Sequence, residues 1–415
     1  MNLFDLGYLA GGALLSPFWA RKKRDGWPER FGRIDDMVTR PDRGRPRIVL
    51  HAVSVGETAA LRSLVPLLAD QAEVIVSTTT DTGLARARSL YADTCDVVRT
   101  PLDFSWAVRR FLDKTAPDVL GLVELEVWPN LIRGCVQRGI PVGVINGRLS
   151  DRSYKGYLRA RPILRPSFRR LSFAWVQDRA YADRFLGMGV PEDRVEVTGS
   201  MKWDAVALAE GDVRTEEAMD LAGALGLDLG RPIVVGGSTG PGEEALLHGA
   251  VPGDVQLVCA PRKPERFEEA AAAMPGCARR SRGGAPAGSG QTRFVLDSIG
   301  ELSTLYRVAD LVVVGRSFGD QFGSDPMEPA GYGRATLIGP AFGDFRTIVG
   351  ALRDAGGIRV VTREGLADAV GGLLSDPSRR EAQGAAAQSC VRAHQGASCR
   401  HAAGLLGLAG MSGLA

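Results

Sequence analysis

The sequence holds few of the residues that build metal sites or disulfide frameworks. Its six cysteines, at positions 95, 135, 259, 277, 390 and 399, include no CxxC pair, and there are only four histidines. Scattered cysteines of this kind are typical of proteins in a reducing compartment, and four dispersed histidines form no cluster for a transition metal. The sequence therefore predicts neither structural zinc nor disulfides, and no metal or other bound cofactor.

The common nucleotide-binding fingerprints are also missing. The glycine-rich segment 236–244 has neither the Gly-Lys-Ser/Thr of a P-loop nor the spacing Gly-x-Gly-x-x-Gly, and the chain contains no Asp-x-Asp pair. Phosphate would have to be bound by helix N-termini and basic side chains. The net charge is only +3, from 51 basic and 48 acidic residues, so no global field indicates a nucleic-acid partner.

What the chain does have is two series of short apolar strands alternating with helical patterns. Such a rhythm is typical of βαβ units and mainly parallel sheets, and 415 residues suit two such domains. We predict boundaries at residues 21–207 and 208–395, a tail at 396–415, a surface loop at 281–290, and one or two helices within 379–406. The predicted strands lie at 47–50, 73–79, 96–100, 119–126, 142–149, 173–177 and 195–198, and at 232–239, 255–261, 292–296, 311–314, 336–338 and 358–361.

The N-terminus departs from this pattern. Residues 6–20 are apolar except for Ser16, and the basic run 21–24 follows directly. A secretory signal would carry its positive charge before the apolar run, so we predict a membrane anchor at 1–20, spanning or monotopic, with the rest of the chain on the cytoplasmic side. The alternative is an apolar arm packed on the protein's own surface or on another subunit.

One strand leads directly to a carboxylate. The apolar run Ile48 to Leu50 is followed by a small-residue turn through Gly56 to Glu57, and a helical pattern is expected from Thr58. Ligands of parallel sheets bind beyond the carboxyl ends of the strands, which makes Glu57 a candidate general base. The alternative is a first-turn glutamate stabilised by the helix dipole.

Eight motifs in order carry a family resemblance. They are His51-Ala-Val-Ser-Val-Gly-Glu57, Glu124-Leu-Glu-Val-Trp-Pro-Asn130, Asn146-Gly-Arg-Leu-Ser150, Thr198-Gly-Ser-Met-Lys-Trp-Asp204, Gly237-Ser-Thr239, Pro261-Arg-Lys-Pro-Glu-Arg-Phe267, Gly300-Glu-Leu302 and Glu328-Pro-Ala330. Together they resemble the 3-deoxy-D-manno-octulosonic acid (Kdo) transferases of lipopolysaccharide biosynthesis, over about residues 1–400. The resemblance implies an α/β protein of glycosyltransferase-B architecture, with two doubly wound Rossmann-like domains facing across a cleft and an N-terminal apolar anchor.

The resemblance also implies a reaction and its partners. Kdo would pass with inversion from CMP-Kdo to a lipid A precursor (lipid IVA), without a bound metal, at the cytoplasmic face of the inner membrane. The first domain would bind the acceptor, with Glu57 as the base that deprotonates its hydroxyl. The other implied residues of this domain are Ser54, Gly56, Glu124, Glu126, Arg148 and Lys202.

Two of these implied roles have structural alternatives. Glu124 and Glu126, two residues apart on one predicted strand, should point to the same face. They would bind sugar hydroxyls or the acceptor, or else form a structural pair that caps Asn130 or the next helix. Arg148 and Lys202 would meet the Kdo carboxylate, or else form surface salt bridges.

The second domain would bind the anionic donor. The resemblance places donor contacts at Ser238, Thr239, Arg262, Lys263, Ser298, Gly300, Glu301 and Glu328. Arg262 and Lys263 supply positive charge for CMP-Kdo and its leaving group. Ser298 is expected to cap a helix whose free N–H groups hold the phosphate, and Glu328 to hydrogen-bond the ribose.

Three positions on the donor side depart from the family pattern. Gly240, Lys263 and Ser324 stand where the family has histidines, and Asp325 adds a carboxylate near a site meant for an anion. These departures keep two alternatives open: a related enzyme that uses another nucleotide sugar, and a non-catalytic homologue that scaffolds envelope assembly.

Overall fold

The computed structural model describes residues 2, 4–9, 25–34, 44–209, 211–286 and 288–412. The chain forms two compact α/β units. The first comprises residues 1–205 together with 395–415, and the second comprises residues 206–394. Each unit contains one seven-stranded sheet in which every pair of neighbouring strands is parallel.

The first sheet has the strand order β3-β2-β1-β4-β5-β6-β7, with the first strand of the chain near its centre. Its core strands are continuous apolar runs because helices cover both faces. The elements of this unit are α2 (Trp27–Arg30), β1 (Arg47–His51), α3 (Val55–Ala60), η2 (Leu61–Ser63), α4 (Leu64–Ala69), β2 (Glu73–Thr78), α5 (Asp81–Tyr91), β3 (Asp96–Arg99), α6 (Ser105–Thr115), β4 (Val119–Val123), α7 (Pro129–Val136), β5 (Val142–Gly147), α8 (Asp151–Arg159), α9 (Arg161–Phe168), β6 (Phe173–Val176), α10 (Arg179–Met188), η3 (Glu192–Arg194), β7 (Val195–Val197), η4 (Trp203–Ala205) and α19 (Ala397–Ser412).

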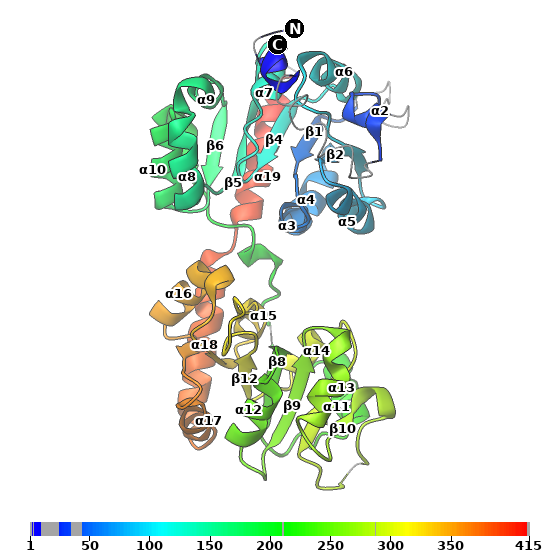
Figure 1. The fold of residues 1–415 in the computed structure, drawn as a ribbon, viewed down its shortest axis with the longest axis vertical. Helices are drawn as coiled ribbons and strands as arrows, with labels where there is room; N and C mark the ends of the chain where they lie inside the picture. The colour runs from blue at the N-terminus through cyan, green and yellow to red at the C-terminus, as the bar shows by residue number, and fades with distance from the viewer. Residues whose placement is uncertain are drawn as a thin grey trace. The chain divides into compact units, whose positions relative to one another are not determined.

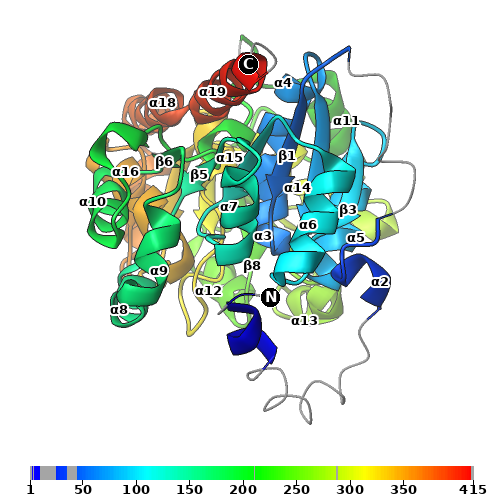
Figure 2. The same ribbon diagram turned by 90° about the horizontal axis from the view of Figure 1, so that it is seen from above.

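Two apolar clusters flank this sheet. One is formed with residues of α6, α7, α9 and α10, and includes the fully buried side chains of Phe168 and Phe185. The other is formed with residues of α4, α5 and α19. Figure 2 shows α4 and α19 on one side of β1 and α6 and α7 on the other.

The C-terminal helix α19 belongs to the first unit although the preceding helix belongs to the second (Figure 1). Asp204 fixes its start: the Asp204 carboxylate accepts hydrogen bonds from the backbone N–H groups of Gly396 and Ser398, both at 2.6 Å. Leu405, fully buried, packs among the residues of the core. The last residues of the chain therefore complete the domain that the first residues begin.

The second sheet has the order β10-β11-β9-β8-β12-β13-β14. Residues of α12, α13 and α17 pack with its strands in one apolar cluster, and α14 and α18 also contact the sheet. The elements are α11 (Glu216–Leu225), β8 (Ile233–Thr239), α12 (Glu243–Ala250), β9 (Gln256–Pro261), η5 (Pro264–Arg266), α13 (Phe267–Ala272), β10 (Ala278–Arg279), η6 (Arg280–Arg282), β11 (Arg293–Val295), α14 (Leu302–Tyr306), β12 (Leu311–Val314), α15 (Met327–Gly331), β13 (Ala335–Ile338), η7 (Gly343–Phe345), α16 (Arg346–Asp354), β14 (Arg359–Val360), α17 (Leu366–Leu374) and α18 (Pro377–His394).

The prediction of two parallel α/β sheets is confirmed, and each of the thirteen predicted strands is present. The two-residue edge strand β10 was not predicted, because two residues are too short to show a pattern. The two C-terminal helices are present as α18 and α19.

The anchor predicted for residues 1–20 lies largely outside the described residues. Residues 4–9 form a short helical segment that packs on the first unit. Asp5 is fully buried there; its carboxylate accepts hydrogen bonds from the backbone N–H and hydroxyl of Ser105, at 2.8 and 2.6 Å. The apolar side chains of Leu6 and Leu9 are 55% and 49% exposed, so polar contacts hold this segment and the anchor stays a prediction. None of the helices in the described ranges is long and apolar enough to cross a membrane.

Candidate functional site

Strained backbone marks the carboxyl edge of each sheet. In the first unit Glu124, directly after β4, and Asn146, near the end of the neighbouring β5, have φ angles of 59° and 50°. In the second unit Ser238 in β8 and Arg316 after β12 have φ angles of 54° and 57°. A left-handed conformation costs a non-glycine residue about 1–3 kcal/mol and tends to occur at functional sites. These two sheet edges are therefore where functional sites are expected.

The strand that was expected to carry both Glu124 and Glu126 ends before them. β4 stops at Val123, and the left-handed conformation of Glu124 turns the chain out of the sheet. The shared strand face predicted for the two carboxylates is therefore wrong. The turn is held to the sheet by the backbone N–H of Glu124, which donates to Ile145 at 3.0 Å.

The carboxylates of Glu57, Glu124 and Glu126 nevertheless interact electrostatically. The pKa of Glu126 is raised to about 7, first by burial and then by the nearby charge of Glu57. The indole N–H of Trp128, which donates to Glu126 at 2.8 Å, opposes the shift. Burial also raises the pKa of Glu124, against the effects of Arg148 and Lys202. A carboxyl group with a pKa near 7 can exchange a proton at neutral pH.

Glu57 occupies the first turn of α3, which begins at Val55 rather than at Thr58. Its carboxylate accepts hydrogen bonds from the backbone N–H of Val53 and the hydroxyl of Ser54, both at 2.8 Å, while Ser54 caps the helix. This resembles a capping box and confirms the helix-start role that the sequence left open for Glu57. The base role stays a prediction.

Gly56 does not make the special turn that the sequence suggested. It lies inside the first turn of α3 and is not among the residues with positive φ. A Cβ added to it would contact only the Ser54 hydroxyl, at 4.0 Å. The turn before the helix is formed instead by the extended conformation of Ser54.

A buried asparagine positions the loop that carries Lys202. The Asn146 side-chain oxygen accepts a hydrogen bond from the backbone N–H of Met201 at 3.1 Å. The exposed side chains of Arg148 and Lys202 influence Glu124 from this edge. His401 of α19 lies within 3.3 Å of the Asn146 backbone nitrogen, and burial lowers its pKa to about 3, so it is neutral. No sequence pattern indicated this support, because α19 comes from the far end of the chain.

The second unit has a cavity of about 490 Å³ at its strained strand ends. Four predicted donor residues line it: Ser238, Arg262, Gly300 and Glu328. The other lining residues were not predicted as donor contacts: Leu302, Ser303, Tyr306, Arg316, Ser324, Asp325 and Phe345. Gly237 makes room for the Tyr306 ring, because a Cβ on this glycine would clash with the Tyr306 hydroxyl, but no sequence pattern links the two residues.

The remaining four predicted donor residues do not line this cavity. Thr239 is buried and donates to Glu244, and Lys263 is exposed and lies 4.0 Å from Glu265. The prediction that Ser298 caps a helix is wrong: α14 begins only at Leu302, and the Ser298 hydroxyl bonds to the carboxylate of Glu301. Glu301 also pairs with Arg280 at 3.0 Å. The phosphate contact expected at this segment stays a prediction, and Gly300 of the segment lines the cavity.

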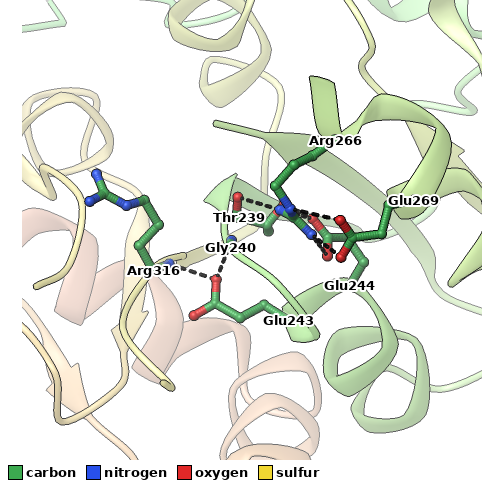
Figure 3. Close-up of polar contacts among 7 residues, drawn as sticks. All are labelled: Thr239, Gly240, Glu243, Glu244, Arg266, Glu269 and Arg316. Atoms are coloured by element: carbon green, nitrogen blue, oxygen red, sulfur yellow. Dashed lines mark hydrogen bonds and ion pairs between the residues drawn. The ribbon is translucent and has the colours of Figure 1, made fainter. Parts of the chain in front are cut away.

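Two buried carboxylates at the start of α12 hold the loops beside the cavity (Figure 3). Glu244 pairs with Arg266, whose Nη2 lies 2.9 Å from it. Glu243 accepts four backbone N–H bonds: from Gly240 at 2.7 Å, from Arg316 at 2.6 Å, and from residues 317 and 318 at 2.9 Å. The sequence showed these two acidic residues after a glycine-rich segment, but their spacing alone did not indicate a loop-holding role.

Comparison with known proteins identifies the family. The model of the family "3-Deoxy-D-manno-octulosonic-acid transferase (kdotransferase)" matches residues 25–205. A 3-deoxy-D-manno-octulosonic acid transferase of Bordetella pertussis is 33% identical over 411 residues, covering 92% of this chain and 93% of that protein. The chain belongs to the Kdo transferase family. A Kdo transferase of Haemophilus influenzae is 30% identical over 385 residues, covering 89% and 88%.

Solved structures of other enzymes share the fold. A glycosyltransferase from Rickettsia africae has a TM-score of 0.56 at 11% identity, covering 88% of this chain and 98% of that one. The UDP-GlcNAc 2-epimerase of Neisseria meningitidis has a TM-score of 0.54 at 13% identity, covering 84% and 98%. The chain thus shares with them a fold of two parallel-sheet units of glycosyltransferase-B type, and its membership of the Kdo transferase family makes it a glycosyltransferase. Within the described residues, no group of three or more His, Cys, Asp or Glu side chains is placed to hold a metal ion.

Proposed function

We propose that this enzyme transfers Kdo from CMP-Kdo to a lipid A precursor, with inversion at the anomeric carbon. The observation that carries the donor assignment is the cavity of the second unit, which brings Arg262 and Arg316 together with a hydroxyl from Ser238. Guanidinium groups bind phosphate and carboxylate in bidentate geometry, and CMP-Kdo carries both anions. Glu328 lines the same cavity and would accept hydrogen bonds from the ribose.

The acceptor reacts at the carboxylates of the first unit. An acceptor hydroxyl oxygen forms a bond to the Kdo anomeric carbon, the bond from that carbon to the CMP phosphate oxygen breaks, and the hydroxyl proton passes to a carboxylate. We assign this base to Glu57 on its match to the family motif. Glu126 is the second candidate because its pKa of about 7 suits proton transfer at neutral pH. Arg148 and Lys202 would meet the Kdo carboxylate from the same sheet edge.

A lipid acceptor requires contact with a membrane, and we place this enzyme at the cytoplasmic face of the inner membrane. The surface of α8 and α9 supports this placement. Leu158 and Ile163 are 40% and 63% exposed there. A basic surface with exposed apolar side chains suits a bilayer that carries anionic lipids. The exposed basic residues on and just after these two helices are Arg152, Lys155, Arg159, Arg165, Arg169 and Arg170.

The donor assignment is tested by thermal unfolding with CMP, UDP and ADP in parallel, because a ligand that binds only the folded state raises the melting temperature. We expect CMP to give the largest rise. Kdo transfer is then measured from CMP-Kdo to a tetra-acylated lipid A precursor. Stabilisation by UDP or ADP alone would favour another nucleotide sugar, and CMP binding without transfer would point to another acceptor or sugar.

The membrane assignment is tested by sedimentation with vesicles. The full chain should pellet with vesicles that contain anionic lipid and much less with zwitterionic vesicles. Replacing Arg165, Arg169 and Arg170 by Gln should weaken this binding, while deletion of residues 1–20 measures the part carried by the N-terminal arm. Equal binding by all three proteins would contradict both attachments.

A further inference from the structure

Gly240 occupies a position where a side chain would disturb its neighbours. A Cβ built on it would lie 2.8 Å from the side-chain oxygen of Gln321 and 3.3 Å from Cγ of Arg316. Gly240 stands where the family pattern has a histidine. In this chain the space beside Gly240 is therefore occupied by Arg316 and Gln321, which follow the neighbouring strand β12.

The backbone of Arg316 is held in place. Its φ of 57° is left-handed, and its N–H donates at 2.6 Å to the same Glu243 carboxylate oxygen that Gly240 N–H contacts at 2.7 Å. One buried carboxylate thus ties both loops together, so the separation between positions 240 and 316 is fixed. A side chain leaving position 316 starts from a defined point at the rim of the cavity.

The guanidinium of Arg316 is directed differently from that of the nearby Arg266. Arg266 forms ion pairs with Glu244 and Glu269, at 2.9 and 3.0 Å, whereas Arg316 points away from that cluster (Figure 3). Nε of Arg316 donates to Gln321 at 2.9 Å, which orients the side chain. Among the described residues no carboxylate forms an ion pair with Arg316, and the residue lines the cavity.

We propose that Arg316 is a specificity-determining residue that binds an anionic group of the nucleotide-sugar donor, in the place of a side chain from position 240. The inference rests on the proposed function, because it takes the cavity as the donor site. The anion is the phosphodiester or the sugar carboxylate, and both suit a guanidinium whose Nε is already engaged by Gln321. The donor contact then comes from the loop after β12 rather than from the loop after β8.

The central test is the variant Arg316→Gly. Glycine adopts positive φ without steric cost, so the variant should fold and melt at the wild-type temperature or above it. Loss of a charge-assisted contact should weaken CMP-Kdo binding at least about tenfold. Arg282→Gly is the matched control, because it removes an exposed arginine of the same unit outside the cavity lining and should leave CMP affinity unchanged.

The ligand series identifies the anion. Cytidine, CMP and CMP-Kdo are titrated without acceptor into wild type and variant by calorimetry. Weakening for CMP and CMP-Kdo assigns the phosphate, and weakening for CMP-Kdo alone assigns the sugar carboxylate. Equal weakening for cytidine would mean that only the shape of the cavity changed, and would overturn the proposal.

A second variant tests whether a side chain at position 240 can replace the one at position 316. Gly240→His combined with Arg316→Gly should recover part of the lost affinity, and no recovery would reject the exchange. Wild-type affinity of Arg316→Gly for both CMP and CMP-Kdo overturns the role of Arg316 and leaves the proposed function standing. If wild type binds UDP or ADP instead of CMP, the affinities of wild type and Arg316→Gly are compared for that nucleotide. If it binds none of the three, the proposed function and this inference are both rejected.

Discussion

At the carboxyl edge of the first sheet, Glu124 and Asn146 have left-handed backbones, and at that of the second sheet Ser238 and Arg316 do. The residues that follow the strands differ in charge between the two units. The first edge gathers carboxylates whose pKa values are raised, and the second presents arginines to a cavity. The same strand geometry thus gathers carboxylates of raised pKa in one unit and places arginines at a cavity in the other.

The carboxylates of the two units also have different partners. Glu126 contacts an indole N–H and holds a proton near neutral pH. Glu243 and Glu244 lie inside the second unit, where backbone N–H groups and Arg266 satisfy them. Buried carboxylates that are fully hydrogen-bonded serve structure, and those that are partly satisfied remain available for chemistry.

The largest effect is expected on the rate of Kdo transfer, from a substitution in the first unit alone. Glu57→Gln should lower Kdo transfer by about a hundredfold to ten-thousandfold, because the amide cannot accept the hydroxyl proton, while CMP binding stays within a few fold. Transfer and CMP binding are measured on the same preparations. The control Asp178→Asn makes the same chemical change at the N-cap of α10, where the side chain accepts the N–H of Tyr181 at 2.8 Å, and should leave transfer unchanged.

Near-normal transfer by Glu57→Gln would contradict the base role and leave only the helix-start role. Glu126→Gln is then the variant to compare, because its parent side chain is the second candidate base. Loss of transfer in Glu126→Gln but not in Glu57→Gln would reassign the base within the same cluster.

The next largest effect is expected on the stability of the second unit alone. Glu244→Ala leaves Arg266 without its buried partner and should destabilise this unit by about 3–5 kcal/mol. All six tryptophans lie in the first unit, so their fluorescence reports its unfolding, whereas circular dichroism reports both units. In urea, the dichroism transition should move to lower concentration while the fluorescence transition does not.

The matched control for Glu244 is Glu268→Ala. Glu268 pairs with Arg279 at 2.7 Å, but its side chain is 78% exposed, and exposed ion pairs contribute about 0–1 kcal/mol. A fluorescence transition that shifts together with the dichroism in Glu244→Ala would show that the two units unfold as one.

A third effect separates the two basic residues predicted for the donor. Arg262→Ala should weaken CMP binding by about tenfold to a hundredfold, because Arg262 lines the cavity and would lose a charge-assisted contact. Lys263→Ala should change it by at most a few fold, because Lys263 is outside the lining. Calorimetric titration with CMP distinguishes them, and equal losses would contradict the placement of the donor in this cavity.

The smallest effect concerns the proton on Glu126. Its pKa is about 7 in the folded chain against a usual 4.5, so folding strengthens proton binding. The resulting stabilisation is fully present below about pH 4.5 and is lost as the pH rises toward 7. Relative to Glu126→Gln, wild type should therefore lose about 2–2.5 kcal/mol of unfolding free energy between pH 5 and 8.

Urea unfolding of wild type and Glu126→Gln at each pH measures this loss. Glu192→Gln, at an exposed position of the same unit, is the control and should follow wild type at every pH. Parallel curves for wild type and Glu126→Gln would place the Glu126 pKa near its usual value.

Sequence reasoning predicted the strands because each is an apolar run between turn signals, and such runs are local. The ends of the strands were less predictable. The strand of Glu124 was drawn too long because its left-handed turn is fixed by a bond to the neighbouring strand. Arg316 was missed because its position depends on Glu243, which lies 73 residues earlier in the chain. Family motifs indicated which polar residues to examine, and the structure separated those that line the cavity from those that do not.

The return of α19 to the first unit has a consequence for how the protein is made. During synthesis, residues 1–205 leave the ribosome without the helix that covers part of their core, and residues 206–394 are complete before that helix emerges. The second unit can therefore fold first, as an insertion within an unfinished neighbour. A fragment that ends at residue 205 would lack the helix that covers part of its core, so an isolated first unit should be built by joining residues 395–415 to it through a short linker.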